Sequence, residues 1–142
     1  MYLQTVTTIA VVLSTMHIRN VHSALRSNRN GRYSSIHTAG IDEVHDVPLG
    51  VLIRPFEAAL EERKVVSLME TLKSPNTSDL VPPIDVLWVT GKQGGNYYYA
   101  FGGNHRYEAF KRLDRSTIPC KLIKSSVATL RVYLGSSLPD LQ

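Results

Sequence analysis

The segment that most constrains the fold is FGGNHRY at residues 101–107, in which two glycines separate an aromatic run from a polar stretch. The run before it, residues 97–99, predicts a strand, and residues 108–113 after it predict a helix. Backbone N–H groups at a helix start favour anions, and glycines let a ligand approach the backbone closely. Arg106 can add the several donors of its guanidinium. The segment therefore predicts an anion-binding turn that includes His105 and Arg106.

The rest of the pattern predicts a small single α/β domain, in which a mixed sheet packs with about three helices. Residues 84–89 are apolar on both faces, which indicates a central strand. Pro119 predicts an edge position or an irregular start for the strand that contains it. Ser126 is expected to cap the last helix, and Gly135 to follow its end. The predicted strands span residues 47–55, 84–89, 97–101 and 117–123, the helices span 57–72, 108–113 and 127–134, residues 91–96 form a hairpin loop, and 136–142 form a tail.

The predicted helix at residues 57–72 carries two stripes. An apolar stripe begins at Val65 with the i, i+3, i+4, i+7 spacing of one buried face. Lys64, Ser67 and Thr71 form a polar stripe beside it, with i, i+3, i+7 spacing. Spacing alone favours a solvated flank, and the functional alternative is a pocket lined by one cation and two hydroxyls.

The charge of the chain is unevenly distributed. Four of its 16 lysines and arginines lie in residues 1–41, which contain no acid, and the other 12 balance all 12 acids. The main body is therefore neutral, which argues against a nucleic-acid-binding surface there.

Residues 1–33 are expected to be an N-terminal extension outside a domain that spans 34–142. The extension contains arginine and serine but no acid, which is typical of a mitochondrial presequence. A disordered tail and a short secretory segment are the alternatives, although no basic residue precedes the apolar run. A single cysteine, Cys120, fits a reducing compartment, and no apolar run approaches the roughly 18 residues of a membrane span. We expect a cytoplasmic or mitochondrial protein without a membrane segment.

Several segments together resemble sulfiredoxins of the animal type. The resemblance covers about residues 34–142, and ParB-type nucleotide-binding domains share the fold but lack several of these segments. The matching segments are residues 35–37, 47–48, 53–55, 81–88, 101–107, 130–135 and the closing PDLQ at 139–142.

The resemblance implies an enzyme that uses ATP and Mg²⁺ to reduce cysteine sulfinic acid in typical 2-Cys peroxiredoxins. In the family, ATP phosphorylates the sulfinate, a sulfiredoxin cysteine attacks the ester to form a thiosulfinate, and an external thiol reductant completes the reduction. A monomer that binds a peroxiredoxin and no nucleic acid is expected.

The resemblance also implies roles for particular residues. Arg54 and Asp85 match the pocket wall, although a salt bridge between them would explain both equally well. Phe101, Tyr133 and the tail match the surface that holds the peroxiredoxin, although both aromatic residues would also suit a core. The residues that match ATP contacts are Lys64, Ser67, Thr71, Gly102, Gly103, Asn104, His105 and Arg106.

Asn104 is the one departure at the site, because the family has its nucleophilic cysteine at this position. A carboxamide cannot replace a thiolate in that attack, but asparagine is a favoured N-cap and would preserve the helix start. Cys120 is not expected to substitute, because strand alternation places it with Ile118 and Leu122 in the core. Three interpretations stay open: a weak reductase, a pseudoenzyme that binds ATP and peroxiredoxin, and an asparagine that is not the native residue. The rival from another class is a ParB-like module that binds nucleotide or nucleic acid.

Overall fold

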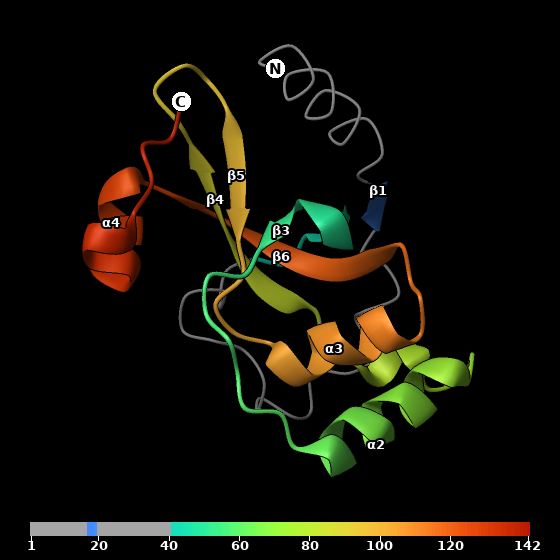
Figure 1. Cartoon of the computed structure of the whole chain (residues 1–142). Coiled ribbons are helices and arrows are strands. Elements are labelled where there is room, and N and C mark those ends of the chain that lie inside the picture. The colour runs from blue at the N-terminus through green and yellow to red at the C-terminus, as the bar shows by residue number, and fades with distance from the viewer. Residues whose placement is uncertain (1–16, 20–40) are drawn as a thin grey trace.

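The fold is a mixed six-stranded sheet in the order β1-β2-β6-β4-β5-β3, seen in a computed structural model that describes residues 17–19 and 41–142 (Figure 1). β4 pairs with β6, and β3 with β5, in parallel, while the other pairs are antiparallel. The mixed sheet and three packed helices in the described residues confirm the predicted α/β class. The elements are β1 (His17–Arg19), β2 (Val44–Pro48), β3 (Leu52–Ile53), α2 (Glu62–Lys73), β4 (Ile84–Thr90), β5 (Asn96–Tyr99), α3 (Asn104–Arg112), β6 (Thr117–Ser125) and α4 (Val127–Leu134).

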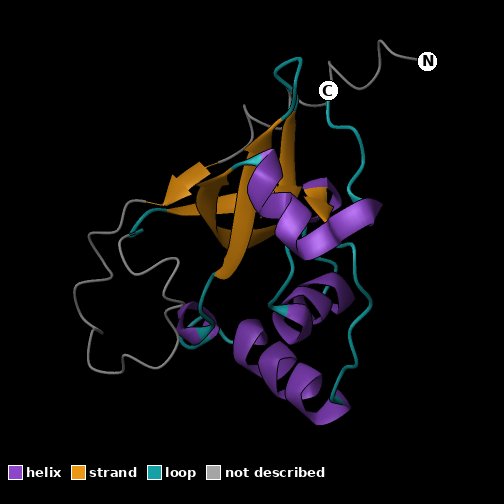
Figure 2. Cartoon of the chain, turned by 90° about the vertical axis from the view of Figure 1, so that its left-hand side faces the viewer, coloured by secondary structure: helices purple, strands orange, loops and turns teal. Residues whose placement is uncertain are grey.

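The sheet has an apolar core on each face. Ile84 and Val86 of β4 join the core that contains residues of α2 and α3, while Val89 joins the core beneath α4. In Figures 1 and 2, α2 and α3 accordingly lie together, and α4 lies apart from them. β4 has a neighbour on each side, so the predicted central strand is confirmed.

The edge position predicted for the strand at Pro119 is wrong, because β6 lies inside the sheet between β2 and β4. The irregularity that the proline indicated is nevertheless present. Pairing of β6 with β4 begins at Cys120, while Pro119 itself faces only Asp46 of β2. The missing N–H of the proline therefore falls just outside the β4–β6 ladder.

Several predicted boundaries shift. The strand expected at residues 47–55 is divided into β2 and β3 by a 3-10 turn, Leu49–Val51, which follows Pro48. α2 starts at Glu62, five residues after the predicted start, and ends one residue late. α3 starts at Asn104 rather than at residue 108, so the polar residues after the glycines are already helical.

The C-terminal segment is predicted as a tail, but it packs against the hairpin between β4 and β5. Leu141 is buried in the core beneath α4. The Gln142 carbonyl oxygen accepts a hydrogen bond of 3.1 Å from the Gly95 N–H, and a Cβ at Gly95 would lie 2.6 Å from the same oxygen. Ser126 caps α4 by accepting from the Thr129 N–H, and Gly135 ends the helix, as predicted.

The predicted N-terminal extension, residues 1–33, lies outside the described residues except for β1, which pairs with β2. Its assignment as a presequence stays a prediction. Among the described residues, no helix is long and apolar enough to cross a membrane.

Candidate functional site

A cavity of about 890 Å³ lies between α2, α3 and the segment before β4. It contains seven of the predicted nucleotide-binding residues, drawn from elements that are distant in the sequence. Gly102 is the one member of that set that does not line it. The cavity is lined by Arg63, Lys64, Ser67, Leu68, Thr71, Leu80, Val81, Pro82, Gly103, Asn104, His105 and Arg106.

Gly103, rather than Asn104, is the N-cap of α3, so the predicted cap is wrong. Gly103 has a φ of 68°, in the left-handed region that glycine adopts without strain. A Cβ at this position would lie 2.5 Å from Cγ2 of Ile84, the first residue of β4. The turn therefore requires glycine both for its backbone conformation and for its close contact with the sheet. Asn104 becomes the first residue of the helix, and its side chain makes no capping bond.

The Asn104 side chain is instead held by Arg54. The guanidinium of Arg54 donates to Oδ1 of Asn104 and also, at 3.3 Å, to the carbonyl oxygen of Gly102. It lies 4.4 Å from the ring centroid of Tyr107. Burial lowers the pKa of Arg54, and the nearby Tyr107 and Glu108 partly oppose that shift. Arg54 thus fixes the glycine turn, although it does not itself line the cavity.

Arg106 lines the cavity, but one of its guanidinium nitrogens already donates hydrogen bonds within the protein. Nη1 donates to the carbonyl oxygens of Pro82 and Pro83 at 3.2 and 2.8 Å. Burial lowers the pKa of Arg106, while the charge of Asp85 raises it. Arg106 therefore ties α3 to the segment that enters β4, and Asp85 acts on this arginine. Among the described residues no ion pair joins Asp85 to Arg54, so the alternative salt bridge between them is not observed.

His105 joins the starts of the two helices. Its Nε2 accepts a hydrogen bond of 3.0 Å from the backbone N–H of Glu61, the N-cap of α2. The carboxylate of Glu61 pairs with Nζ of Lys64 at 2.5 Å, and this hydrogen bond lowers the pKa of Glu61. Because Nε2 acts as an acceptor, the proton of the neutral imidazole lies on Nδ1.

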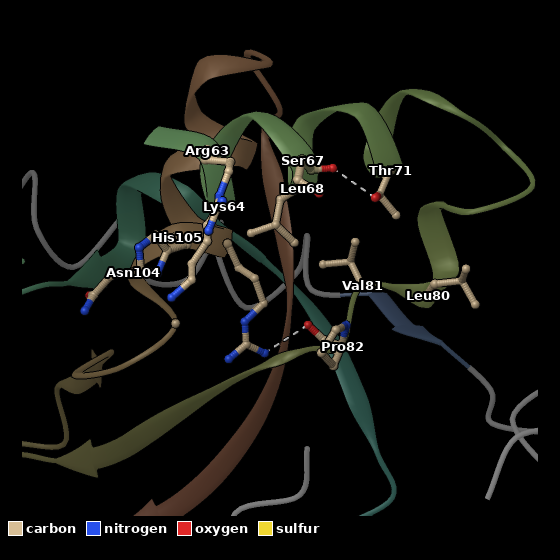
Figure 3. Close-up of a pocket in the computed structure, with 12 residues that line it drawn as sticks. Arg63, Lys64, Ser67, Leu68, Thr71, Leu80, Val81, Pro82, Asn104 and His105 are labelled. Carbon is tan, nitrogen blue, oxygen red and sulfur yellow. Dashed lines mark hydrogen bonds between the residues drawn. The ribbon is translucent and has the colours of Figure 1, made fainter. Parts of the chain in front are cut away.

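The cavity is polar at one end and apolar at the other. In Figure 3, Arg63, Lys64, Asn104 and His105 gather at the left, and Leu80 and Val81 lie at the right. None of the described residues that line the cavity carries a carboxylate. This set of donors suits phosphates attached to an apolar group. Within the described ranges, no group of three or more His, Cys, Asp or Glu side chains could hold a metal ion.

The sequence prediction missed five lining residues. Arg63 lies one helical turn before Ser67, so extending the polar stripe backwards would have found it. Leu68 was assigned to the buried face of the same helix. Leu80, Val81 and Pro82 carry no signal in the helix pattern, because they reach the cavity through a separate loop.

The two residues predicted to contact a partner protein lie outside the cavity. The rings of Phe101 and Tyr133 stack with centroids 4.5 Å apart, and Phe56 lies 5.8 Å from Phe101. Phe56 and Tyr133 are exposed, with 52% and 45% of their surface accessible. Phe101 also packs on the core beneath α4. These residues therefore form an aromatic patch that is only partly covered.

Cys120 is enclosed in the core on β6 and has no exposed surface. Burial, followed by the charge of Asp46, raises the pKa of its thiol well above the ordinary range, with a smaller opposing effect of Arg106. A buried, protonated thiol is a poor nucleophile.

The ParB N-terminal domain model matches residues 33–138. The chain is 50% identical over 90 residues to the BEACH domain-containing protein lvsE of Dictyostelium discoideum, but spans only 4% of that protein's length. It is 41% identical over 116 residues to sulfiredoxin of Schizosaccharomyces pombe, with 73% of this chain and 93% of the relative covered. The crystal structure of sulfiredoxin from Arabidopsis thaliana is 35% identical, with a TM-score of 0.54, and the match covers 64% of this chain and 96% of that chain. The chain belongs to the sulfiredoxin family, within the ParB N-terminal domain fold.

Proposed function

We propose that the protein uses ATP and Mg²⁺ to reduce cysteine sulfinic acid in a hyperoxidised 2-Cys peroxiredoxin. The observation that carries this proposal is the cavity in which Lys64, Ser67 and Thr71 of α2 face the start of α3. Family membership supports the same reaction, and the lack of acids among the described lining residues suits a polyphosphate.

The residues present fit a nucleotide in one orientation. Lys64, His105 and the backbone N–H groups at the start of α3 would bind phosphates, and Ser67 and Thr71 would offer hydroxyls toward the middle of the cavity. The apolar group would lie near Leu80. Mg²⁺ would neutralise phosphate charge, and it would enter with the nucleotide because the described lining residues offer no carboxylate.

The chemistry balances with two thiols. A sulfinate oxygen attacks the terminal phosphorus, and ADP leaves. A thiolate then attacks the sulfur of the sulfinic phosphoryl ester, which releases phosphate and forms a thiosulfinate. A second thiol attacks the sulfenyl sulfur of the thiosulfinate, giving a disulfide and the peroxiredoxin sulfenic acid. We propose that an external thiol supplies both sulfur atoms, because Asn104 replaces the family's own nucleophile.

Binding without turnover is a second candidate function. The observation that favours it is the hydrogen bond from Arg54 to Asn104, since the arginine that faces the nucleophile position is already occupied by a neutral partner. In this case the protein would hold ATP and the peroxiredoxin but leave the sulfinate unchanged.

The aromatic patch of Phe56, Phe101 and Tyr133 is proposed as the surface that contacts the peroxiredoxin. Its partial exposure supports this assignment. We further propose a monomer that acts in the cytoplasm or mitochondrion and does not use nucleic acid.

Two measurements test the proposal. Calorimetry with ATP and Mg²⁺ is expected to show one site, and the absence of nucleotide binding would contradict both candidate functions. Mass spectrometry then follows the sulfinate of hyperoxidised peroxiredoxin in the presence of ATP, with and without dithiothreitol or glutathione. Loss of the sulfinate only when ATP and thiol are both present supports the reductase, whereas ATP and peroxiredoxin binding without loss supports the second candidate. Salt-sensitive DNA binding in place of ATP binding would favour a ParB-like module.

A further inference from the structure

The side chains that could carry positive charge in the cavity differ in how many of their donors are free. Lys64 is paired with the Glu61 carboxylate at 2.5 Å, and His105 accepts from the Glu61 N–H at 3.0 Å. Arg106 donates to two proline carbonyls. Arg63 also lines the cavity, but its side chain makes no hydrogen bond or ion pair with any residue in the described part of the chain. Its guanidinium therefore keeps all of its donors available.

Arg63 occupies a specific place relative to the apolar end of the cavity. It is the second residue of α2, on the polar side of the cavity with Lys64 and His105 (Figure 3). Thr71 lies eight residues further along the same helix, which corresponds to about 12 Å at the helical rise. A ligand whose apolar part lies beyond Thr71, near Leu80, would reach Arg63 only through an extended chain.

We propose that Arg63 binds the terminal phosphates of the nucleotide and makes the site selective for a triphosphate over a monophosphate. This inference rests on the proposed function, because it assigns a residue within the same nucleotide site. A guanidinium can bind two phosphate oxygens at once, and Arg63 needs to give up no existing partner to do so. Lys64, in contrast, already pairs its charge with the Glu61 carboxylate. The start of α2 adds its helix dipole to the attraction.

The test is calorimetry on the full chain with Mg²⁺ and either ATP or AMP. Arg63→Ala is compared with wild type and with Arg131→Ala, which removes an exposed arginine from α4, outside the cavity. Arg63→Ala is expected to weaken ATP binding about 10- to 100-fold, the range for losing charge-assisted hydrogen bonds. AMP binding should change less than about two-fold, and Arg131→Ala should leave both ligands unaffected.

The possible failures can be told apart. If wild type binds ATP and Arg63→Ala binds it equally well, the role of Arg63 is refuted while the nucleotide site stands. If Arg63→Ala weakens the binding of ATP and of AMP equally, the assignment of Arg63 to the terminal phosphates is refuted. If wild type binds neither ligand, the proposed function and this inference both fail. Thermal unfolding should be unchanged in Arg63→Ala, because the exposed side chain has no hydrogen bond or ion pair to lose among the described residues.

Discussion

The guanidinium of Arg54 donates a hydrogen bond to the carboxamide oxygen of Asn104, the residue at the start of α3. Arg54 also bonds the Gly102 carbonyl and packs over Tyr107, so its position does not depend on Asn104 alone. A cationic group and a helix N-terminus thus remain directed at the place where the family has its nucleophile. Both features would stabilise a thiolate at this position.

Asn104→Cys is therefore expected to gain sulfinate reductase activity, or to raise it greatly. The new thiol would lie beside Arg54 and the first N–H groups of α3, which lower the pKa of a cysteine. The measurement is the ATP-dependent rate at which mass spectrometry records loss of the peroxiredoxin sulfinate.

Asn104→Ser is the matched control, since a hydroxyl has nearly the shape of a thiol but is far less nucleophilic toward sulfur. It should show no gain. Equal rates for wild type and Asn104→Cys would mean that the nucleophile lies elsewhere. Arg54→Met in the cysteine variant should reduce the gain by raising the thiol pKa.

Gly103→Ala should destabilise the domain by about 2–4 kcal/mol, because the left-handed backbone and the contact with Ile84 both oppose a Cβ. Gly102→Ala provides the control, since a Cβ there meets nothing within 4 Å. Urea unfolding of the two variants measures the difference. If both variants are as stable as wild type, the conformation described for the turn is incorrect.

Lys64→Ala and Arg106→Ala should separate binding from stability. Lys64 lines the cavity, so its loss should weaken ATP binding. Because its side chain is exposed, the free energy of unfolding should change by less than about 0.5 kcal/mol. Arg106→Ala leaves two proline carbonyls without their donor and should cost about 2 kcal/mol or more. Calorimetry and urea unfolding report the two effects.

Lys73→Ala is the control for Lys64, because it removes a similar i, i+3 pair with Glu70 outside the cavity. It should retain normal ATP binding. An Arg106→Ala variant as stable as wild type, but unable to bind ATP, would show that the arginine acts on phosphate rather than as a tether.

Cys120 should make the protein less stable at alkaline pH. Its thiol pKa is raised in the folded state above the ordinary value of 9.0, so the folded protein retains a proton that the unfolded chain loses. The stabilising contribution is complete below about pH 9.0 and falls as the pH rises above that value, by about 1.4 kcal/mol per unit. Urea unfolding between pH 7 and 10.5 measures this slope.

Cys120→Ala should show a smaller loss of stability over the same range, with the buried tyrosines accounting for the remainder. Ellman's reagent provides a second readout, because the native thiol should not react until the protein unfolds. Rapid labelling of Cys120 in the native state would contradict its assignment to the core.

Local patterns predicted the elements of the fold, but not every relation between them. The apolar residues on both faces of β4 identified it as a central strand, because a strand that is apolar on both faces must be covered on both. Pro119 suggested an edge, yet β6 is internal, because pairing with β4 starts one residue later. Such a register depends on which strands meet, and single-strand patterns do not contain that information.

At the site, too, local patterns predicted single residues but not the contacts between distant segments. The spacing of Lys64, Ser67 and Thr71 placed them on one stripe, but spacing alone could not distinguish a cavity from solvent. Arg106 was correctly placed at the helix start, whereas its bonds to Pro82 and Pro83 come from a loop more than 20 residues away. Asn104 was predicted to cap α3 from its residue type, but Ile84 leaves room only for a glycine at the cap.

The interior position of β6 has a consequence for synthesis of the protein. β6 separates β2 from β4, although both of these strands leave the ribosome well before it does. Until β6 is made, the edges of β2 and β4 that it will cover have no partner, and unpaired edges promote association between chains. α3, which carries His105, leads directly into β6. We therefore expect the nascent chain to complete its sheet and its cavity together, late in translation, and to depend on protection from aggregation until then.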